Sequence, residues 1–212
     1  DAAAAAGLGF VGGLTTNPAL MARETADPPA HFARLLAAFP EGPAFYQPLH
    51  TAGTAVLDEA RAAAALAPTR VAIKLGATAD GAAAAATLVR EGVCCALTAA
   101  YTPSQALVAH ETGCSWVIPY VDRADRLGVG GQKLVAAMAG LVARLGSGTR
   151  ILAASLKTPE QLVAALLGGA HDVTAPLDVL RALPRHPLSD EAMTAFASAW
   201  AAEHGDQARP RT

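Results

Sequence analysis

The sequence predicts an α/β protein built as a (β/α)8, or TIM, barrel, and three observations support this. Short apolar runs alternate with alanine-rich stretches that have helical spacing. The runs begin every 22 to 34 residues, which is the spacing of βα units. Several runs are apolar almost throughout, as is typical of parallel strands that are buried on both faces. Repeated βα units around a buried parallel sheet are the pattern of a (β/α)8 barrel.

The first expected element is a short helix in the alanine run at residues 2–6, because alanine has the highest helix propensity. Seven strands are expected after it, at residues 10–15, 44–49, 71–76, 94–99, 116–121, 150–155 and 172–176. A closed barrel has eight strands, so the first strand is predicted to be missing from the given sequence. No linker divides the chain, and we expect one domain over residues 1–212 that ends in a C-terminal helix.

Helices are expected between the strands, and two of them have matching start signals. Helical spacing is clearest at residues 53–67 and 132–145. The segments TPSQ (102–105) and TPEQ (158–161) each offer a threonine N-cap, a proline at the first helical position and a glutamine at the third. Each follows a predicted strand closely, so the strands are expected to feed short loops and then helices.

Polar side chains gather at the predicted carboxyl ends of the strands, where (β/α)8 barrels hold their active sites. They are Thr15, Thr16, Asn17, Gln47, Lys74, Thr98, Tyr120, Arg123 and Ser155. The set contains one amine, one phenol, one guanidinium and several neutral hydrogen-bonding groups. Such groups are suited to a phosphorylated carbonyl compound that carries several hydroxyls.

Lys74 is unusual because it lies inside a run, TRVAIKLGAT (69–78), that otherwise reads as a buried strand. The chain has three lysines against thirteen arginines, and lysine is rarely buried without a partner or a chemical task. Burial disfavours the charged form of an amine. A neutral amine attacks a ketone to form a Schiff base. The other interpretation is a side chain that extends from the barrel mouth and neutralises a carboxylate.

The other strand-end residues each allow a functional and a structural interpretation. Tyr120 can transfer a proton beside an iminium, or can be an ordinary aromatic residue at the barrel mouth. Arg123 is suited to a phosphate, or to a surface ion pair with Asp122 or Asp125. The remaining threonine, serine, asparagine and glutamine residues can hold water or sugar hydroxyls, or can simply cap helices.

Composition and charge exclude several classes of function. The net charge of −2 argues against nucleic acid or an anionic membrane surface as the main partner. The uncharged run at residues 2–22 is broken by glycines, threonines and Pro18, so it does not read as a membrane span. The motif GLGFVG (7–12) precedes a strand instead of following one, which is the reverse of the dinucleotide-binding context.

The cysteines and histidines do not predict a metal site. The three cysteines, Cys94, Cys95 and Cys114, have no zinc-like spacing, and we interpret them as small buried apolar residues. The six histidines are scattered, with no pair at ligand spacing. A metal-dependent reaction is therefore disfavoured. Thiols without disulfide spacing fit a cytoplasmic, reducing location.

Six segments together resemble the transaldolase family, and its small, fructose-6-phosphate aldolase-like branch in particular. They are GLTTNPALM (13–21), VAIKLGATADG (71–81), LTAAYTPSQA (97–106), IPYVDR (118–123), LAASLKTPEQ (152–161) and HPLSDEAMTAFASAW (186–200). The resemblance implies a (β/α)8 barrel, a homo-oligomer, and Schiff-base chemistry that needs no cofactor or metal. It also implies a sugar-phosphate substrate, and it places the Schiff-base lysine at Lys74.

The resemblance further implies roles for the strand-end residues. Asn17, next to Thr16, resembles the family's sugar-hydroxyl binder, and Thr98 resembles the threonine that holds the catalytic water. Arg123 and Ser155 resemble the phosphate-binding pair. Two further positions separate the branches of the family. Gln47 and Tyr120 stand where transaldolases usually carry Glu and Phe, and this combination resembles the aldolase branch.

Three functions are compatible with these residues and with the resemblance. The first is a class I aldolase that handles a ketose phosphate, such as fructose 6-phosphate, through a dihydroxyacetone enamine on Lys74. The second is a transaldolase that passes the three-carbon unit to an aldose phosphate, for example in the biosynthesis of an unusual sugar. The third is an inactive sugar-phosphate-binding barrel, suggested by the missing first strand with its family aspartate and by Gly76, where the family usually has proline.

Overall fold

The computed structural model describes residues 2–204 of the 212-residue chain. Seven strands form one sheet in chain order, and each pairs in parallel with the next. They are β1 (Leu14–Thr15), β2 (Ala44–Tyr46), β3 (Val71–Gly76), β4 (Cys95–Ala100), β5 (Trp116–Pro119), β6 (Arg150–Ala153) and β7 (Asp172–Val173). All seven predicted strands are confirmed, although several are shorter than the apolar runs that predicted them.

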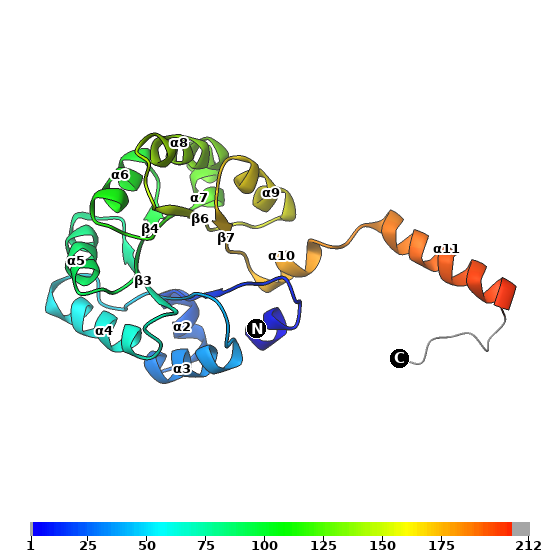
Figure 1. The fold of residues 1–212 in the computed structure, drawn as a ribbon, viewed down its shortest axis with the longest axis horizontal. Coiled ribbons are helices and arrows are strands. Elements are labelled where there is room, and N and C mark those ends of the chain that lie inside the picture. Colours follow the sequence, from blue (N-terminus) through cyan, green and yellow to red (C-terminus); the bar gives the residue numbers. More distant parts are fainter. Residues whose placement is uncertain (1, 205–212) are drawn as a thin grey trace.

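The sheet curls into a partial barrel with helices around its outside, as Figure 1 shows. The helices are α1 (Ala2–Ala6), α2 (Pro18–Glu24), α3 (Pro28–Ala38), α4 (Gly53–Ala65), α5 (Ala79–Arg90), α6 (Pro103–Glu111), α7 (Val121–Arg126), α8 (Gly131–Arg144), α9 (Pro159–Leu167), α10 (Leu177–Ala182) and α11 (Pro187–His204). The predicted starts of α6 and α9 are confirmed, with N-caps at Thr102 and Thr158 and a proline directly after each.

Alternation along the strands separates two apolar cores. One small cluster consists of Phe45, Ala72, Ala96, Ile118, Leu152 and Ala154, which lie on successive strands or directly after one. The strand residues between these positions belong to a larger cluster that also contains the helix residues. Because successive side chains of a strand point to opposite faces, the small cluster fills the inside of the curled sheet and the large cluster joins its outside to the helices.

The sheet remains open between its first and last strands, so the observed fold is an open form of the predicted closed barrel. Among the described residues, β1 pairs only with β2, and β7 pairs only with β6. A side-chain hydrogen bond spans the seam between them, since the hydroxyl oxygens of Thr15 and Thr174 lie 3.0 Å apart. The strand ends are therefore held close at the side of the sheet where the strands finish.

The last described helix, α11, lies apart from the ring of strands and helices (Figure 1). None of its side chains is buried. Met193, Phe196 and Trp200 recur at helical spacing and are 60%, 66% and 55% exposed. Within residues 2–204, no helix has the length and apolar character needed to cross a membrane.

Candidate active site

Four predicted residues share one layer inside the barrel. Gln47, Lys74, Thr98 and Tyr120 each lie two positions after a member of the inner apolar cluster. Residues two apart on a strand point to the same face, so Lys74 of β3 and Thr98 of β4 face inward, near the carboxyl ends of their strands. Gln47 and Tyr120 directly follow β2 and β5 and continue the same alternation. The register places Thr98 beside Gly76, close to Lys74, and Tyr120 packs against the inner cluster.

Lys74 points into the barrel, because its side chain is enclosed and not extended from the mouth. The residue is 5% exposed, and its Nζ donates a hydrogen bond of 2.6 Å to the carbonyl oxygen of Thr16. Among the described residues it forms no ion pair with a carboxylate. Burial lowers the pKa of Lys74 from the ordinary value of 10.5 to about 8. About a tenth of the amine is therefore neutral at pH 7, far more than for an ordinary lysine.

Gln47 and Thr98 each present a buried polar atom without a protein partner. The Oε1 atom of Gln47 and the Oγ1 atom of Thr98 make no hydrogen bond within residues 2–204, and Thr98 is fully buried. Buried polar groups are nearly always paired with protein or water. Two such atoms in the layer of Lys74 therefore mark a place suited to a water molecule or a substrate hydroxyl.

Arg123 is held by two tyrosines. Its Nη1 donates to the phenolic oxygen of Tyr101 at 3.3 Å, and its guanidinium carbon lies 5.0 Å from the centroid of the Tyr120 ring. Asp122 pairs with Arg126 at 3.0 Å, and Asp125 accepts a hydrogen bond from a backbone amide. The alternative ion pair of Arg123 with Asp122 or Asp125 is thus not formed, and the guanidinium charge is available to bind an anion.

Tyr101 was not expected at the site. Its ring meets that of Tyr120 edge to face, with centroids 6.1 Å apart. Its phenolic oxygen accepts from Arg123, so its own proton is free to reach a neighbouring anion. The signal in the sequence is an aromatic residue three positions after Thr98 and directly before the N-cap Thr102.

Ser155 lies next to Arg123 because the backbone joins their segments. The amide of Asp122 donates to the carbonyl oxygen of Ser155 at 3.0 Å. Ser155 has a φ of 59°, and Ala99, in the irregular end of β4, has the same value. Positive φ is uncommon for residues other than glycine, and such backbone concentrates at functional sites. Two strand ends of the layer therefore have this strained geometry.

Thr16 and Asn17, the two residues after β1, use side-chain atoms in hydrogen bonds within the protein. The Oδ1 atom of Asn17 accepts from the amide of Leu20 at 2.8 Å and caps α2, which leaves its amide nitrogen for a ligand. The hydroxyl of Thr16 donates to the carbonyl of Phe45 at 3.0 Å. Thr16 meets Lys74 through its backbone oxygen and not through its side chain.

The three cysteines lie away from this layer, around the beginnings of β4 and β5. All are free thiols, and Cys95 and Cys114 are buried while Cys94 is partly exposed. Burial raises the pKa of both buried thiols. Across residues 2–204, no three His, Cys, Asp or Glu side chains are grouped so that they can hold a metal ion.

Comparison with known proteins adds a family. Residues 46–209 match the model of a family described as transaldolase/fructose-6-phosphate aldolase. A probable transaldolase of Symbiobacterium thermophilum is 35% identical over 200 residues, which cover 93% of this chain and 90% of that protein. A probable transaldolase of a Roseiflexus species is 34% identical over 198 residues, which cover 93% and 91% of the two chains.

Proposed function

The chain belongs to the transaldolase/fructose-6-phosphate aldolase family, and we propose that it is a class I aldolase acting on a ketose phosphate such as fructose 6-phosphate. The single observation that supports this best is Lys74, a buried amine inside the barrel that within residues 2–204 is paired only with a backbone carbonyl. The architecture we propose for the whole site is the closed (β/α)8 barrel, whose remaining strand belongs at the seam between β1 and β7.

The proposed reaction begins when neutral Lys74 attacks the ketone carbon, and loss of water gives an iminium ion. The bond between C3 and C4 then breaks. Its electron pair moves toward the iminium nitrogen and forms an enamine, the C4 hydroxyl loses its proton to water, and an aldose phosphate leaves. A proton added to the enamine carbon and hydrolysis of the resulting iminium release dihydroxyacetone and restore the amine.

The proton and the hydrolytic water are assigned to the polar layer around Lys74. We assign a water molecule to the unpaired oxygens of Gln47 and Thr98, within reach of the phenol of Tyr120. A phenol can deliver a proton to the enamine carbon, which a phenyl ring cannot do. This supports release of the three-carbon unit over its transfer.

The substrate phosphate is assigned to Arg123 and Ser155, and Asn17 and Thr16 are assigned to the sugar hydroxyls. Arg123 has no carboxylate partner in the described part of the chain. Ser155 lies beside α7, the helix of Arg123, because its carbonyl oxygen accepts a hydrogen bond from the amide of Asp122. Guanidinium groups bind phosphate through charge-assisted hydrogen bonds. Three free thiols fit a reducing compartment such as the cytoplasm.

Borohydride trapping tests the proposal. With dihydroxyacetone or fructose 6-phosphate present, reduction should add the mass of the three-carbon unit to the peptide that contains Lys74. Lys74→Met should abolish the adduct, and Lys133→Met, which changes an exposed lysine, should leave it intact. Tight binding of the sugar phosphate without an adduct would instead favour a binding protein that lacks the chemistry.

A transaldolase is the second candidate, and it is supported by the names of the relatives, which are probable transaldolases. It shares the enamine on Lys74 but passes the three-carbon unit to an aldose phosphate. Turnover with and without an acceptor separates the two functions. Formation of dihydroxyacetone without an acceptor supports the aldolase, whereas product that appears only with an acceptor supports the transaldolase.

The apolar stripe of α11 supports a homo-oligomer in which this helix packs on a neighbouring copy. The described part of their own chain leaves Met193, Phe196 and Trp200 more than half exposed, and a neighbouring copy packed on this face would bury them. Light scattering should show an assembly. Phe196→Glu together with Trp200→Glu should shift it toward monomers, and an unchanged mass would reject this role for α11.

A further inference from the structure

The side-chain amide oxygen of Gln47, Oε1, has no hydrogen-bond partner among the described residues, so no hydrogen bond to this oxygen fixes the side chain. Gln47 also lies just beyond the last residue of β2, where pairing with β3 has ended. Something other than the sheet must therefore hold this segment if Gln47 is to keep one position relative to Lys74.

Glu59, on the second turn of α4, holds the segment from outside the barrel. Its carboxylate accepts a hydrogen bond of 2.8 Å from the phenol of Tyr46 and bonds of 2.9 and 3.2 Å from the amides of Leu49 and His50. The Nδ1 atom of the His50 ring lies 2.7 Å from Oε2. All four donors belong to residues 46–50, so they precede and follow Gln47 in the sequence.

The carboxylate is well suited to this task because it is largely enclosed and stays ionised. The Glu59 side chain is 14% exposed. Burial alone would raise the pKa of Glu59, but the hydrogen bonds from Leu49, His50 and Tyr46 outweigh burial and lower it. Burial and the bond to Glu59 also raise the pKa of Tyr46, so its phenol remains a donor. Hydrogen bonds to an ionised acceptor are about twice as strong as neutral ones.

Because side chains alternate along a strand, the hydrogen bonds of Glu59 on the outer face can affect Gln47 on the inner face. Tyr46 points outward to the helices, where it meets Glu59 and lies 4.9 Å, centroid to centroid, from Phe32. Gln47 is the next residue and therefore points inward. A shift of Tyr46 or of the amides at residues 49 and 50 moves the backbone from which the Gln47 side chain projects.

We propose that Glu59 is a positioning residue that fixes Gln47, and with it the catalytic water, through the segment at residues 46–50. The inference rests on the proposed function, in which Gln47 holds that water. A merely structural clip between α4 and β2 would change stability without acting through Gln47. The two roles are therefore separated by whether the effect of Glu59 on turnover depends on Gln47.

The test is a cycle of Glu59→Gln, Gln47→Leu and the double variant in the full chain. Two rates are measured, the trapping of the Lys74 adduct by borohydride and the release of dihydroxyacetone. Glu59→Gln should slow release by about 10-fold or more, because small displacements of positioned groups are costly, and should leave trapping nearly unchanged. In the Gln47→Leu background the same change should alter release by less than about two-fold. Equal effects in both backgrounds would overturn the proposal.

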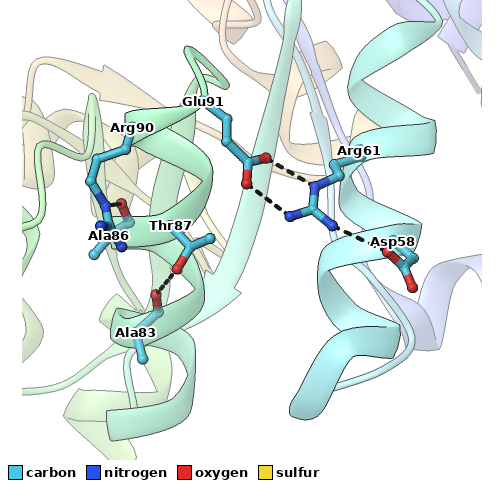
Figure 2. A network of polar contacts seen from close by, with 7 residues as sticks. All are labelled: Asp58, Arg61, Ala83, Ala86, Thr87, Arg90 and Glu91. Atoms are coloured by element: carbon cyan, nitrogen blue, oxygen red, sulfur yellow. Dashed lines mark hydrogen bonds and ion pairs between the residues drawn. The ribbon is translucent and has the colours of Figure 1, made fainter.

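Glu91 provides a matched control for the loss of a carboxylate. It receives bonds of 2.9 and 2.8 Å from Arg61, which also reaches Asp58, as Figure 2 shows. This network links α4 to the end of α5 without contact to residues 46–50. Glu91→Gln should therefore leave release unchanged. A loss of release as large as that of Glu59→Gln would mean that damage to α4 in general is enough, and would overturn the proposal.

Failure of the proposed function can be told apart from failure of this inference. An absent adduct in the unaltered protein rejects the aldolase, while the side-chain amide signals of Gln47 in an NMR spectrum still report its position. These signals should shift or broaden in Glu59→Gln and stay unchanged in Glu91→Gln. An unchanged Gln47 signal in Glu59→Gln overturns the inference. Should Glu59→Gln fail to fold, Tyr46→Phe replaces that variant in the cycle. This change removes the phenol that donates to Glu59 and keeps the ring against Phe32.

Discussion

Replacement of Lys74 by methionine should stabilise the protein at neutral pH, although it removes the amine to which we assign the Schiff base. The pKa of Lys74 falls from 10.5 to about 8 because the amine is buried. One pKa unit corresponds to about 1.36 kcal/mol, so burial of the charged amine costs about 3 kcal/mol. Loss of the hydrogen bond to the Thr16 carbonyl offsets about 1 kcal/mol of this. Lys74→Met should therefore raise the free energy of unfolding by about 2 kcal/mol at pH 7.

The sign of the effect changes with pH. Below pH 8 the folded and unfolded states both hold the proton, and the folded state bears the full cost of burying it. Between pH 8 and 10.5 the folded protein has released a proton that the unfolded chain still binds, so the stability of the unaltered protein rises with pH. Above pH 10.5 the cost is gone and only the lost hydrogen bond remains. Lys74→Met should then be less stable by about 1 kcal/mol.

Urea unfolding of both proteins between pH 7 and 10.5 measures this crossover, because other titrating groups cancel in the difference between them. Lys133→Met is the matched control, since it replaces an exposed lysine by the same residue. A Lys74→Met variant that is destabilised at pH 7, or a difference that stays constant with pH, would refute the argument that Lys74 is held in a desolvating site.

Three further predictions concern the phosphate site, the fate of the enamine and the strand end beside Lys74. Arg123→Met should raise KM for a ketose phosphate by about 10-fold to 100-fold, because a charged hydrogen bond is worth about 1.5–3 kcal/mol. KM for dihydroxyacetone, which has no phosphate, should not change, and Arg126→Met should change neither. Tyr120→Phe should slow release of the three-carbon unit by about 100-fold while transfer to an acceptor persists, and equal losses in both assays would contradict this. Gly76→Ala should be tolerated, because its new methyl group would meet Thr78 at an ordinary 3.8 Å. Gly81→Ala should reduce the free energy of unfolding by about 2 kcal/mol or more, because its methyl group would lie 1.9 Å from the Gly76 carbonyl oxygen. Thermal unfolding of the two glycine variants compares them directly.

The order of elements could be predicted from the sequence because each strand and each helix start depends on local chemistry. Thr102 and Thr158 signal helix starts by hydrogen-bonding groups within four residues, and the strands are signalled by uninterrupted apolar runs. Strand ends were less predictable. Tyr120 belongs to the apolar run WVIPYV, yet it is the N-cap of α7, because its segment bonds across to Ala154 and Ser155 before turning into the helix. That contact joins residues far apart in the chain.

The site residues are predictable where a residue type conflicts with its surroundings, as Lys74 does in an apolar strand. Residues whose type fits their surroundings give no such signal. Glu59 reads as an ordinary exposed charge on a helix, and Tyr101 as an aromatic residue after a strand. Their importance comes from partners on other elements, namely residues 46–50 for Glu59 and Arg123 for Tyr101. Asn17 shows the converse, because its amide oxygen is used to cap α2.

The inner and outer faces of β2 show how one strand serves both stability and chemistry. On the outer face, Tyr46 donates to a carboxylate whose hydrogen bonds come from the same segment, and the aromatic contact with Phe32 adds packing. On the inner face, the next residue, Gln47, keeps a buried oxygen unpaired. An unpaired buried polar group costs about 1–3 kcal/mol, so a bound water or substrate hydroxyl that pairs with Oε1 of Gln47 would offset that cost. In the proposed site, the period of two along a strand places the hydrogen-bonded network of Glu59 on the outer face and the unpaired oxygen of Gln47 on the inner face, one residue apart.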